Sequence, residues 1–227
     1  MARDPRFEAI LFDLDGTLVD TAPDMVAALI DIQKSEGHET VSYDVARTYV
    51  SHGATGLISL GFPEVSAHEH ERLRLEFLER YERAVCVHST LFPGLDELLD
   101  VFDAAGLPWG IVTNKPARMT MPLLEALGIG VRSASTISGD TIPQRKPDPA
   151  PLLLASRETG VAPHRTVYVG DAARDIEAGR AAGMFTIAAT YGYVTADDDP
   201  AAWNADEIAV DTQELAHLLL KGVNLGA

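Results

Sequence analysis

A short apolar run that ends in two aspartates constrains the fold of this chain more than any other feature. The run covers residues 9–12 and leads into Asp13-Leu14-Asp15-Gly16. It is too short for a helix and fits a buried strand of a parallel sheet. Two carboxylates this close repel each other, which a divalent cation relieves, and Gly16 lets the chain turn sharply beside a ligand. Taken alone, this motif is equally consistent with an ordinary acidic turn after a strand.

The remainder of the chain divides into two patterns. The stretch from residue 23 to 86 reads almost wholly helical, with Leu73, Phe77 and Tyr81 recurring every four residues. From residue 91 onward, predicted helices (94–105, 117–127, 149–159 and 174–182) alternate with predicted strands (109–113, 166–170 and 185–189). Strands separated by helices indicate a parallel sheet. We therefore expect an α/β core, formed by residues 1–20 and 87–227, that is interrupted by a helical insertion at residues 21–86.

Charge and cysteine content exclude several classes of partner. A formal net charge of −16 gives no electrostatic basis for binding nucleic acid or an anionic membrane. The single cysteine, Cys86, excludes an intramolecular disulfide and suits a reducing cytosol, so we expect a cytoplasmic protein. The sequence has no apolar stretch of about 18 residues, the length that suggests a spanning helix. We also expect no signal peptide, since the first apolar run is short and leads straight into Asp13.

Further polar residues are predicted near the carboxyl ends of strands. Thr113 and Asn114 follow one strand, Asp171 and Asp175 follow another, and Lys146 lies just ahead of a helix start. Each has an ordinary explanation when taken alone: Thr-Asn is common in turns, such a lysine is usually solvated, and acids cap helices. In a parallel sheet, however, these ends meet at one rim, and we expect the residues to converge there.

The combined set is rich in hard oxygen donors. Such donors suit Mg²⁺, which binds through few carboxylates and a phosphate. The sequence has no His or Cys cluster with zinc spacing, no Walker-type phosphate loop, no G-x-S-x-G nucleophile turn and no dinucleotide-binding glycine motif after a strand. The sequence therefore favours magnesium-assisted chemistry on a small anionic substrate.

The order of these motifs resembles that of the haloacid dehalogenase superfamily of phosphatases. The similarity spans about residues 7–211 and is carried by Phe12-Asp13-Leu14-Asp15-Gly16-Thr17-Leu18, Thr113, Lys146-Pro147 and Gly170-Asp171-x-x-x-Asp175. It implies a Rossmann-like parallel core with residues 21–86 as a helical cap domain over the active site. A second aspartate two residues after the first is typical of the phosphatases, so Asp15 argues against carbon–halogen cleavage.

The resemblance also implies roles for individual residues. Asp13 would be the nucleophile that forms an aspartyl-phosphate, and Asp15 the acid that protonates the leaving alcohol and then the base that acts on water. Thr113 and Lys146 would hold phosphate oxygens, and Lys146 would also damp repulsion between Asp13 and the substrate.

Metal and substrate ligands follow from the same resemblance. Mg²⁺ would be held by Asp13, Asp171 and the backbone carbonyl of Asp15, with Asp175 in support. The candidate substrate-binding residues, two on the core and three in a cap turn, are Gly16, Asn114, Ser51, His52 and Gly53.

Within the superfamily, the chain resembles phosphoglycolate phosphatases and, more closely, N-acetylmuramic acid 6-phosphate phosphatases. The segment Gln144–Pro149 favours the phosphoglycolate group slightly, whereas Trp109-Gly110, the stretch from 74 to 89 and Tyr191-Gly192-Tyr193 with Trp203 favour the muramic group. His52 matches neither. We expect a small phosphorylated metabolite as substrate and a monomer or homodimer, and we keep a sugar phosphomutase and a non-catalytic phosphosugar-binding module as alternatives.

Overall fold

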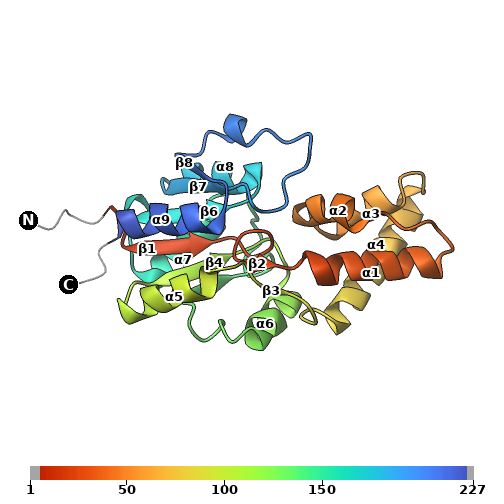
Figure 1. The fold of residues 1–227 in the computed structure, drawn as a ribbon, viewed down its shortest axis with the longest axis horizontal. Helices are drawn as coiled ribbons and strands as arrows, with labels where there is room; N and C mark the ends of the chain where they lie inside the picture. The colour runs from red at the N-terminus through yellow and green to blue at the C-terminus, as the bar shows by residue number, and fades with distance from the viewer. Residues whose placement is uncertain (1–5, 224–227) are drawn as a thin grey trace, which may run out of the picture.

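A six-stranded parallel sheet lies at the centre of the molecule (Figure 1). The fold is that of a computed structural model, which describes residues 6–223. The strands are β1 (Ala9–Phe12), β4 (Trp109–Val112), β5 (Ser135–Ile137), β6 (Thr166–Gly170), β7 (Phe185–Ala189) and β8 (Glu207–Ala209). Their order is β5-β4-β1-β6-β7-β8, and every neighbouring pair is parallel. The order therefore reverses at β1, which has β4 on one side and β6 on the other.

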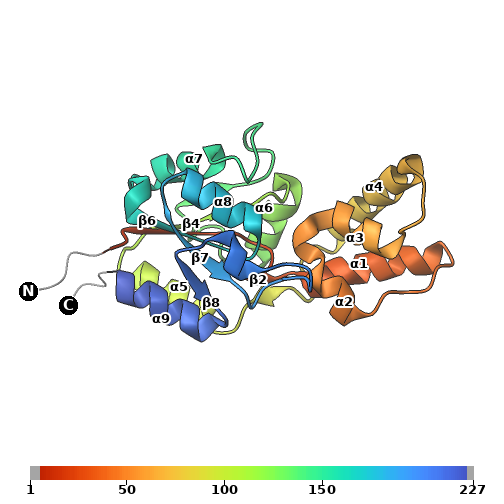
Figure 2. The same ribbon diagram turned by 90° about the horizontal axis from the view of Figure 1, so that it is seen from above.

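Helices cover both faces of this sheet (Figure 2). One face carries α5 (Leu95–Ala104) and α9 (Thr212–Gly222), and the other carries α7 (Ala150–Thr159) and α8 (Ala173–Ala181). A further helix, α6 (Ala117–Ala126), connects β4 to β5. Because both faces are covered, every residue of β1, β4 and β6 is buried, which explains why these strands read as continuous apolar runs. The predicted α/β class with a Rossmann-like core is confirmed.

The predicted elements agree with the structure at the sheet centre and differ at its edges. β1, β6 and β7 begin and end at the predicted residues. The sequence patterns do not predict β5 and β8, the two edge strands, because three residues carry too little periodicity to be recognised. Helix α7 begins at Ala150, one residue later than predicted, and Asp148 Oδ1 accepts a hydrogen bond from its N–H at 2.8 Å.

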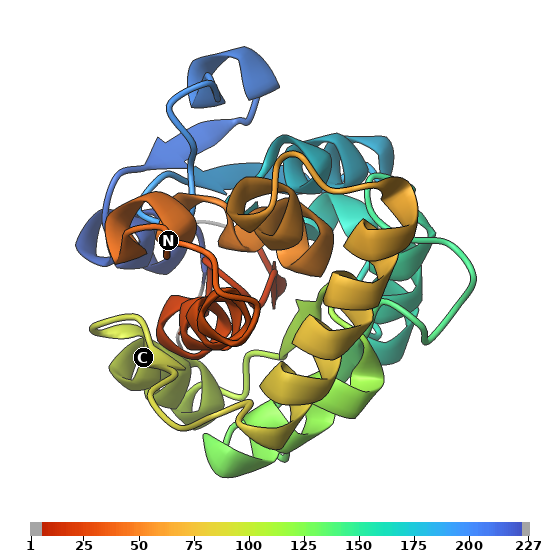
Figure 3. The ribbon, with the colours of Figure 1, turned by 90° about the vertical axis from the view of Figure 1, so that its right-hand side faces the viewer.

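Residues 21–86, called the helical segment below, lie beyond the carboxyl ends of the strands (Figures 1 and 3). The helices are α1 (Ala22–Ser35), α2 (Tyr43–Thr48), α3 (Gly53–Gly61) and α4 (Ala67–Arg83). Leu73, Phe77 and Tyr81 on α4 are buried as the periodicity predicts, and α4 packs against α1 and α3. The turn expected at residues 51–56 is instead helical: a 3₁₀ turn at Val50–His52 continues into α3.

The chain enters and leaves the helical segment through two adjacent strands. β2 (Val19–Asp20) pairs antiparallel with β3 (Thr90–Leu91). No helix in the described part of the chain is both long and apolar enough to cross a membrane. Residues 1–5 and 224–227, which belong to the predicted core, lie outside the described residues.

Candidate active site

The predicted rim forms where the sheet order reverses. Asp13 follows β1, Thr113 follows β4 and Asp171 follows β6, which are three adjacent strands. All three side chains are buried. In open α/β sheets this reversal opens a crevice at the carboxyl ends of the strands, and ligands bind there.

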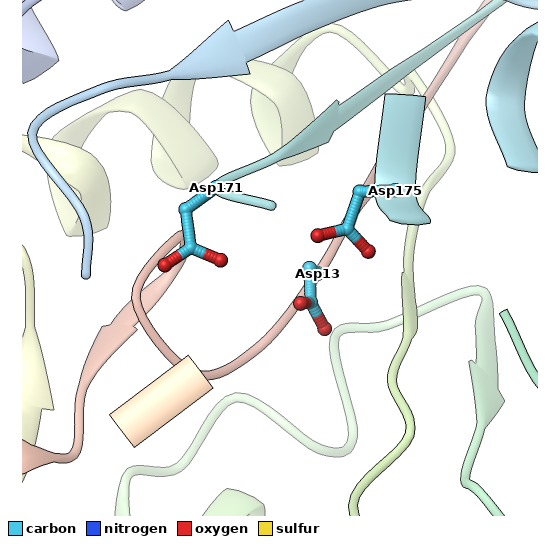
Figure 4. Close-up of side chains that lie close together, drawn as sticks. All are labelled: Asp13, Asp171 and Asp175. Atoms are coloured by element: carbon cyan, nitrogen blue, oxygen red, sulfur yellow. The ribbon is translucent and has the colours of Figure 1, made fainter. Parts of the chain in front are cut away.

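Three acids lie close together beside the carboxyl ends of β1 and β6 (Figure 4). Asp13, Asp171 and Asp175 each place a carboxylate oxygen within 4.8 Å of the others. Burial and its two acidic neighbours raise the pKa of Asp171 to about 7, and burial also raises the pKa of Asp13. Asp171 Oδ1 is buried without a hydrogen-bond partner in the described part of the chain. This acidic cluster thus has more negative charge and acceptor capacity than its protein neighbours satisfy.

The cluster fits a small, hard divalent cation. Its donors are carboxylate oxygens, one of them without a hydrogen-bond partner, and Mg²⁺ prefers such ligands. Gly16, at φ +80°, passes so close behind Asp171 that an added Cβ would lie 2.1 Å from its Oδ2. Any larger residue at position 16 would therefore displace the Asp171 carboxylate.

Lys146 is the cation beside these acids. Its Nζ lies 2.9 Å from Asp13 Oδ1 and 2.7 Å from Asp175 Oδ1, and it bonds the Tyr168 hydroxyl at 2.7 Å. Asn114 holds the Lys146 backbone from both sides: its Nδ2 donates to the carbonyl at 3.0 Å, and its Oδ1 accepts from the N–H at 3.1 Å. Asn114, predicted to bind substrate, therefore also positions Lys146.

Asp15 lies across the rim and has two donors on one oxygen. Its Oδ1 accepts hydrogen bonds from Thr21 Oγ1 at 2.6 Å and from Lys115 Nζ at 2.9 Å. Although burial opposes its charge, the Asp15 carboxylate raises the pKa of Lys115 above its ordinary value. Sequence reasoning missed Lys115, since the motif around residues 113–116 shows nothing that separates it from a solvated lysine.

A cavity of about 440 Å³ lies between this rim and the helical segment. Asp13, Asp15 and Thr113 line it from the core, and Ser51, His52 and Gly53 line it from the helical segment. The structure therefore brings the predicted cap residues to the same space as the predicted catalytic aspartates.

Other predicted site residues lie outside the cavity wall. Among the described residues, Gly16, Lys146, Asp171 and Asp175 do not line it and lie behind the wall. Ser51 nevertheless reaches this buried layer, because its hydroxyl donates to Asp171 Oδ2 at 2.6 Å.

The tyrosines that distinguish the two resembled groups are also away from the cavity wall. The Tyr191 hydroxyl donates to the Thr17 carbonyl at 2.8 Å. The Tyr193 N–H donates to Asp171 Oδ2 at 2.9 Å, and its hydroxyl donates to Asp20 Oδ1 at 2.7 Å. The backbone of Tyr193 thus supports the acidic cluster, and its side chain supports the entry to the helical segment.

Arginines add positive charge to the cavity. Arg74 pairs with Glu71 at 2.7 Å, and Arg145 donates to the Gly139 carbonyl at 2.6 Å. The Arg174 guanidinium makes no ion pair or hydrogen bond within residues 6–223; although burial opposes its charge, the nearby Asp175, Asp13 and Asp171 raise its pKa. The lining therefore offers positive charge to an anionic ligand, with Arg174 the least committed of the three.

Comparison with known proteins identifies the family. Over 215 residues the chain is 43% identical to an N-acetylmuramic acid 6-phosphate phosphatase of Pseudomonas aeruginosa, covering 94% of this chain and 95% of the relative. Over 207 residues it is 44% identical to a phosphoglycolate phosphatase of Xanthomonas campestris pv. campestris, covering 91% and 94%. The crystal structure of a predicted phosphoglycolate phosphatase from Haemophilus somnus superposes with a TM-score of 0.82 at 29% identity, covering 94% and 98%. Residues 10–189 match the haloacid dehalogenase-like hydrolase family, and the chain belongs to that family.

Proposed function

We propose that this protein is a magnesium-dependent phosphoric monoester hydrolase that works through an aspartyl-phosphate. The observation that carries this proposal is the placement of Asp13. Its carboxylate is buried between Lys146 and the other two acids of the cluster, yet it reaches the cavity wall. Membership of a hydrolase family with phosphatase relatives over more than nine-tenths of the chain supports the same conclusion.

In this mechanism Asp13 is the nucleophile. Its Oδ1 accepts hydrogen bonds from the Leu14 N–H at 2.7 Å and is paired with Lys146, which orients the carboxylate. Thr113 and Lys146 hold the oxygens of the transferring phosphoryl group, and their donors balance the charge that this group carries. Asp13, Asp171 and Asp175, with the Asp15 carbonyl, would hold Mg²⁺, which when bound neutralises phosphate charge and orients the phosphoryl group.

Asp15 acts as acid and then as base. It first gives a proton to the departing alcohol and then takes one from the water that hydrolyses the aspartyl-phosphate. Its position on the cavity wall, two residues after Asp13, supports this role.

We propose that the helical segment is the cap domain, with boundaries at residues 20 and 87. Both of its connections pass through the β2–β3 pair, and it supplies one wall of the cavity. Ser51, His52 and Gly53 then contact the substrate from the cap side. Closure over the rim would exclude bulk water until the hydrolytic step.

For the substrate we propose N-acetylmuramic acid 6-phosphate, which would place the protein in cell-wall recycling in the cytoplasm. A cavity of about 440 Å³ is in the size range of sites for drug-sized ligands, and a phosphorylated amino sugar fills it better than phosphoglycolate. Arg174 on the cavity wall would help to balance the negative charge of this substrate, which carries a carboxylate besides its phosphate. Phosphoglycolate is the second candidate, because it also combines a phosphate with a carboxylate and because phosphoglycolate phosphatases are among the relatives.

Phosphate release from both esters, measured side by side with and without Mg²⁺, tests this proposal. We expect a kcat/KM at least a hundredfold higher for the muramic ester, about 2.7 kcal/mol of differential transition-state stabilisation. The opposite preference would identify a phosphoglycolate phosphatase. Turnover without stoichiometric release of inorganic phosphate would point to a mutase instead.

A further inference from the structure

The two oxygens of Asp15 have different surroundings. Oδ1 accepts from Thr21 Oγ1 and Lys115 Nζ, whereas no described residue bonds to Oδ2. An ammonium group has donors only, so an oxygen that it holds is a poor place for the carboxyl proton. Thr21 and Lys115 thus both engage Oδ1, which leaves Oδ2 as the Asp15 oxygen without a partner among residues 6–223.

Lys115 is itself fixed from the helical segment. Its Nζ lies 2.8 Å from the hydroxyl of Tyr81 on α4 and 4.4 Å from the centroid of the Tyr81 ring. The side chain of Lys115 is only 4% exposed, so the ammonium has little freedom to move. Tyr81 in turn stacks on Phe77, with ring centroids 6.2 Å apart. The orientation of Asp15 thus depends on a chain of contacts that crosses from the helical segment to the core.

We propose that Lys115, anchored by Tyr81, is a positioning residue that presents Oδ2 of Asp15 to the leaving-group oxygen. This inference rests on the proposed phosphatase function. In the first step the Asp13–phosphorus bond forms, the ester P–O bond breaks and the proton on Asp15 Oδ2 passes to the alcohol oxygen. In the second step water forms a bond to phosphorus, its proton goes to Asp15 Oδ2 and the bond between Asp13 and phosphorus breaks. Lys115 keeps its protons throughout.

A direct role for Lys115 in holding the phosphate is the main rival to this assignment. A phosphate ligand stabilises the phosphoryl group of every ester to a similar extent. A residue that acts through Asp15 matters only when the departing oxygen needs a proton. The loss of activity on removing Lys115 should therefore depend on the leaving group if Lys115 acts through Asp15. It should not depend on the leaving group if Lys115 holds the phosphate or has a purely structural role.

The test compares Lys115→Met with wild type on two kinds of ester. N-acetylmuramic acid 6-phosphate and 2-phosphoglycolate release alcohols that need a proton, whereas p-nitrophenyl phosphate releases a stable anion. The comparison uses kcat/KM, which covers the steps up to alcohol departure. We expect a loss of about 100-fold on the better alkyl ester and of less than about 5-fold on the aryl ester. Equal losses on both would overturn the proposal.

Tyr81→Phe gives a second, milder test. It removes only the hydroxyl that anchors Lys115 and keeps the ring contact with Phe77, so it remains informative if Lys115→Met does not fold. We expect a loss of about 10-fold on the alkyl ester and little change on the aryl ester, and a uniform loss or none would count against the proposal. Lys34→Met, at an exposed position on α1, is the matched control. A wild-type protein inactive on all three esters would contradict the proposed function itself rather than this inference.

Discussion

Two buried carboxylates in this chain have opposite surroundings. Asp24, in the first turn of α1, accepts hydrogen bonds from the backbone N–H groups of Val87, His88 and Ser89 at 2.9–3.0 Å and from the Ser89 hydroxyl at 2.6 Å. Asp171, at the rim, has donors on Oδ2 only, and its Oδ1 is without a partner in the described part of the chain. The protein supplies hydrogen-bond donors to both oxygens of the Asp24 carboxylate but to only one oxygen of Asp171.

The difference separates a carboxylate that the fold satisfies from one that we propose binds a cation. Asp24 ties the segment returning from α4 to the start of α1, so it secures both connections of the helical segment. Asp171 lies beside two further acids, and its shortage of donors favours a ligand with positive charge. Proximity to the first turn of a helix does not reveal this difference, since both aspartates share it; what separates Asp171 in the sequence is its place directly after β6.

The largest effect is expected at Asp13, in the acidic cluster. Asp13→Asn keeps the shape of the side chain but removes the nucleophile, so turnover should fall by at least about 10⁴-fold. The protein should still fold, because the change removes a buried negative charge next to two others. Phosphate release and a urea unfolding curve check the two halves of this prediction. A folded variant with a near-normal rate would refute the nucleophile assignment.

Asp171→Asn gives the sharpest test of the comparison between Asp24 and Asp171, because it should lower activity and raise metal-free stability. We expect activity to fall by about 10³-fold, since a metal ligand is lost. We also expect the free energy of unfolding at pH 8 without Mg²⁺ to rise by about 1 kcal/mol, since a poorly compensated buried charge is removed. Urea denaturation with and without Mg²⁺ measures this, and a clear loss of metal-free stability would contradict it.

Asp24→Ala should show the reverse behaviour. It leaves several donors near α1 without an acceptor, so we expect a loss of about 3 kcal/mol in the free energy of unfolding. The activity of the folded protein should fall far less than in Asp171→Asn. Asp31→Ala, at an exposed position of the same helix, is the control and should change stability by less than about 0.5 kcal/mol. Equal effects at residues 24 and 31 would show that the hydrogen bonds of Asp24 contribute little.

The smallest effect is expected at Ser51, which joins the helical segment to the acidic cluster. Ser51→Ala removes the donor that orients Asp171, so the affinity for Mg²⁺ should fall by about tenfold. Calorimetric titration with Mg²⁺ measures the change. Ser59→Ala, on the exposed side of α3, should leave the affinity unaltered. An unaltered affinity in Ser51→Ala would mean that Asp171 is oriented by the Tyr193 N–H alone.

Sequence patterns predict the centre of the sheet well, because strands buried on both faces are continuous apolar runs with polar residues at their ends. Thr166–Gly170 and Phe185–Ala189 illustrate this. The edge strands β5 and β8 are only three residues long, and pairing with a neighbour rather than local sequence defines them. The glycines at residues 51–56 predict a turn, but this stretch is helical because α3 packs against α4.

The site was predictable where chemistry follows a strand end, as at Asp13, Thr113 and Asp171. It was not predictable where a side chain is defined by a distant partner. Lys115 differs from a solvated lysine through Asp15 and Tyr81, which lie 100 and 34 residues away in the chain. Arg174 similarly reads as an ordinary residue of a helix, and only the cavity shows which way its charge can act.

The pairing of β2 with β3 has a consequence for how such proteins diversify. Because the two connections of the helical segment run side by side, residues 21–86 join the sheet as a long excursion between two adjacent points. The entropic cost of closing such an excursion grows only slowly with its length. Insertions, deletions or wholesale replacement of this excursion therefore place little strain on the sheet that carries the aspartates. The helical segment can therefore change in length and sequence while the sheet that carries the aspartates keeps its fold.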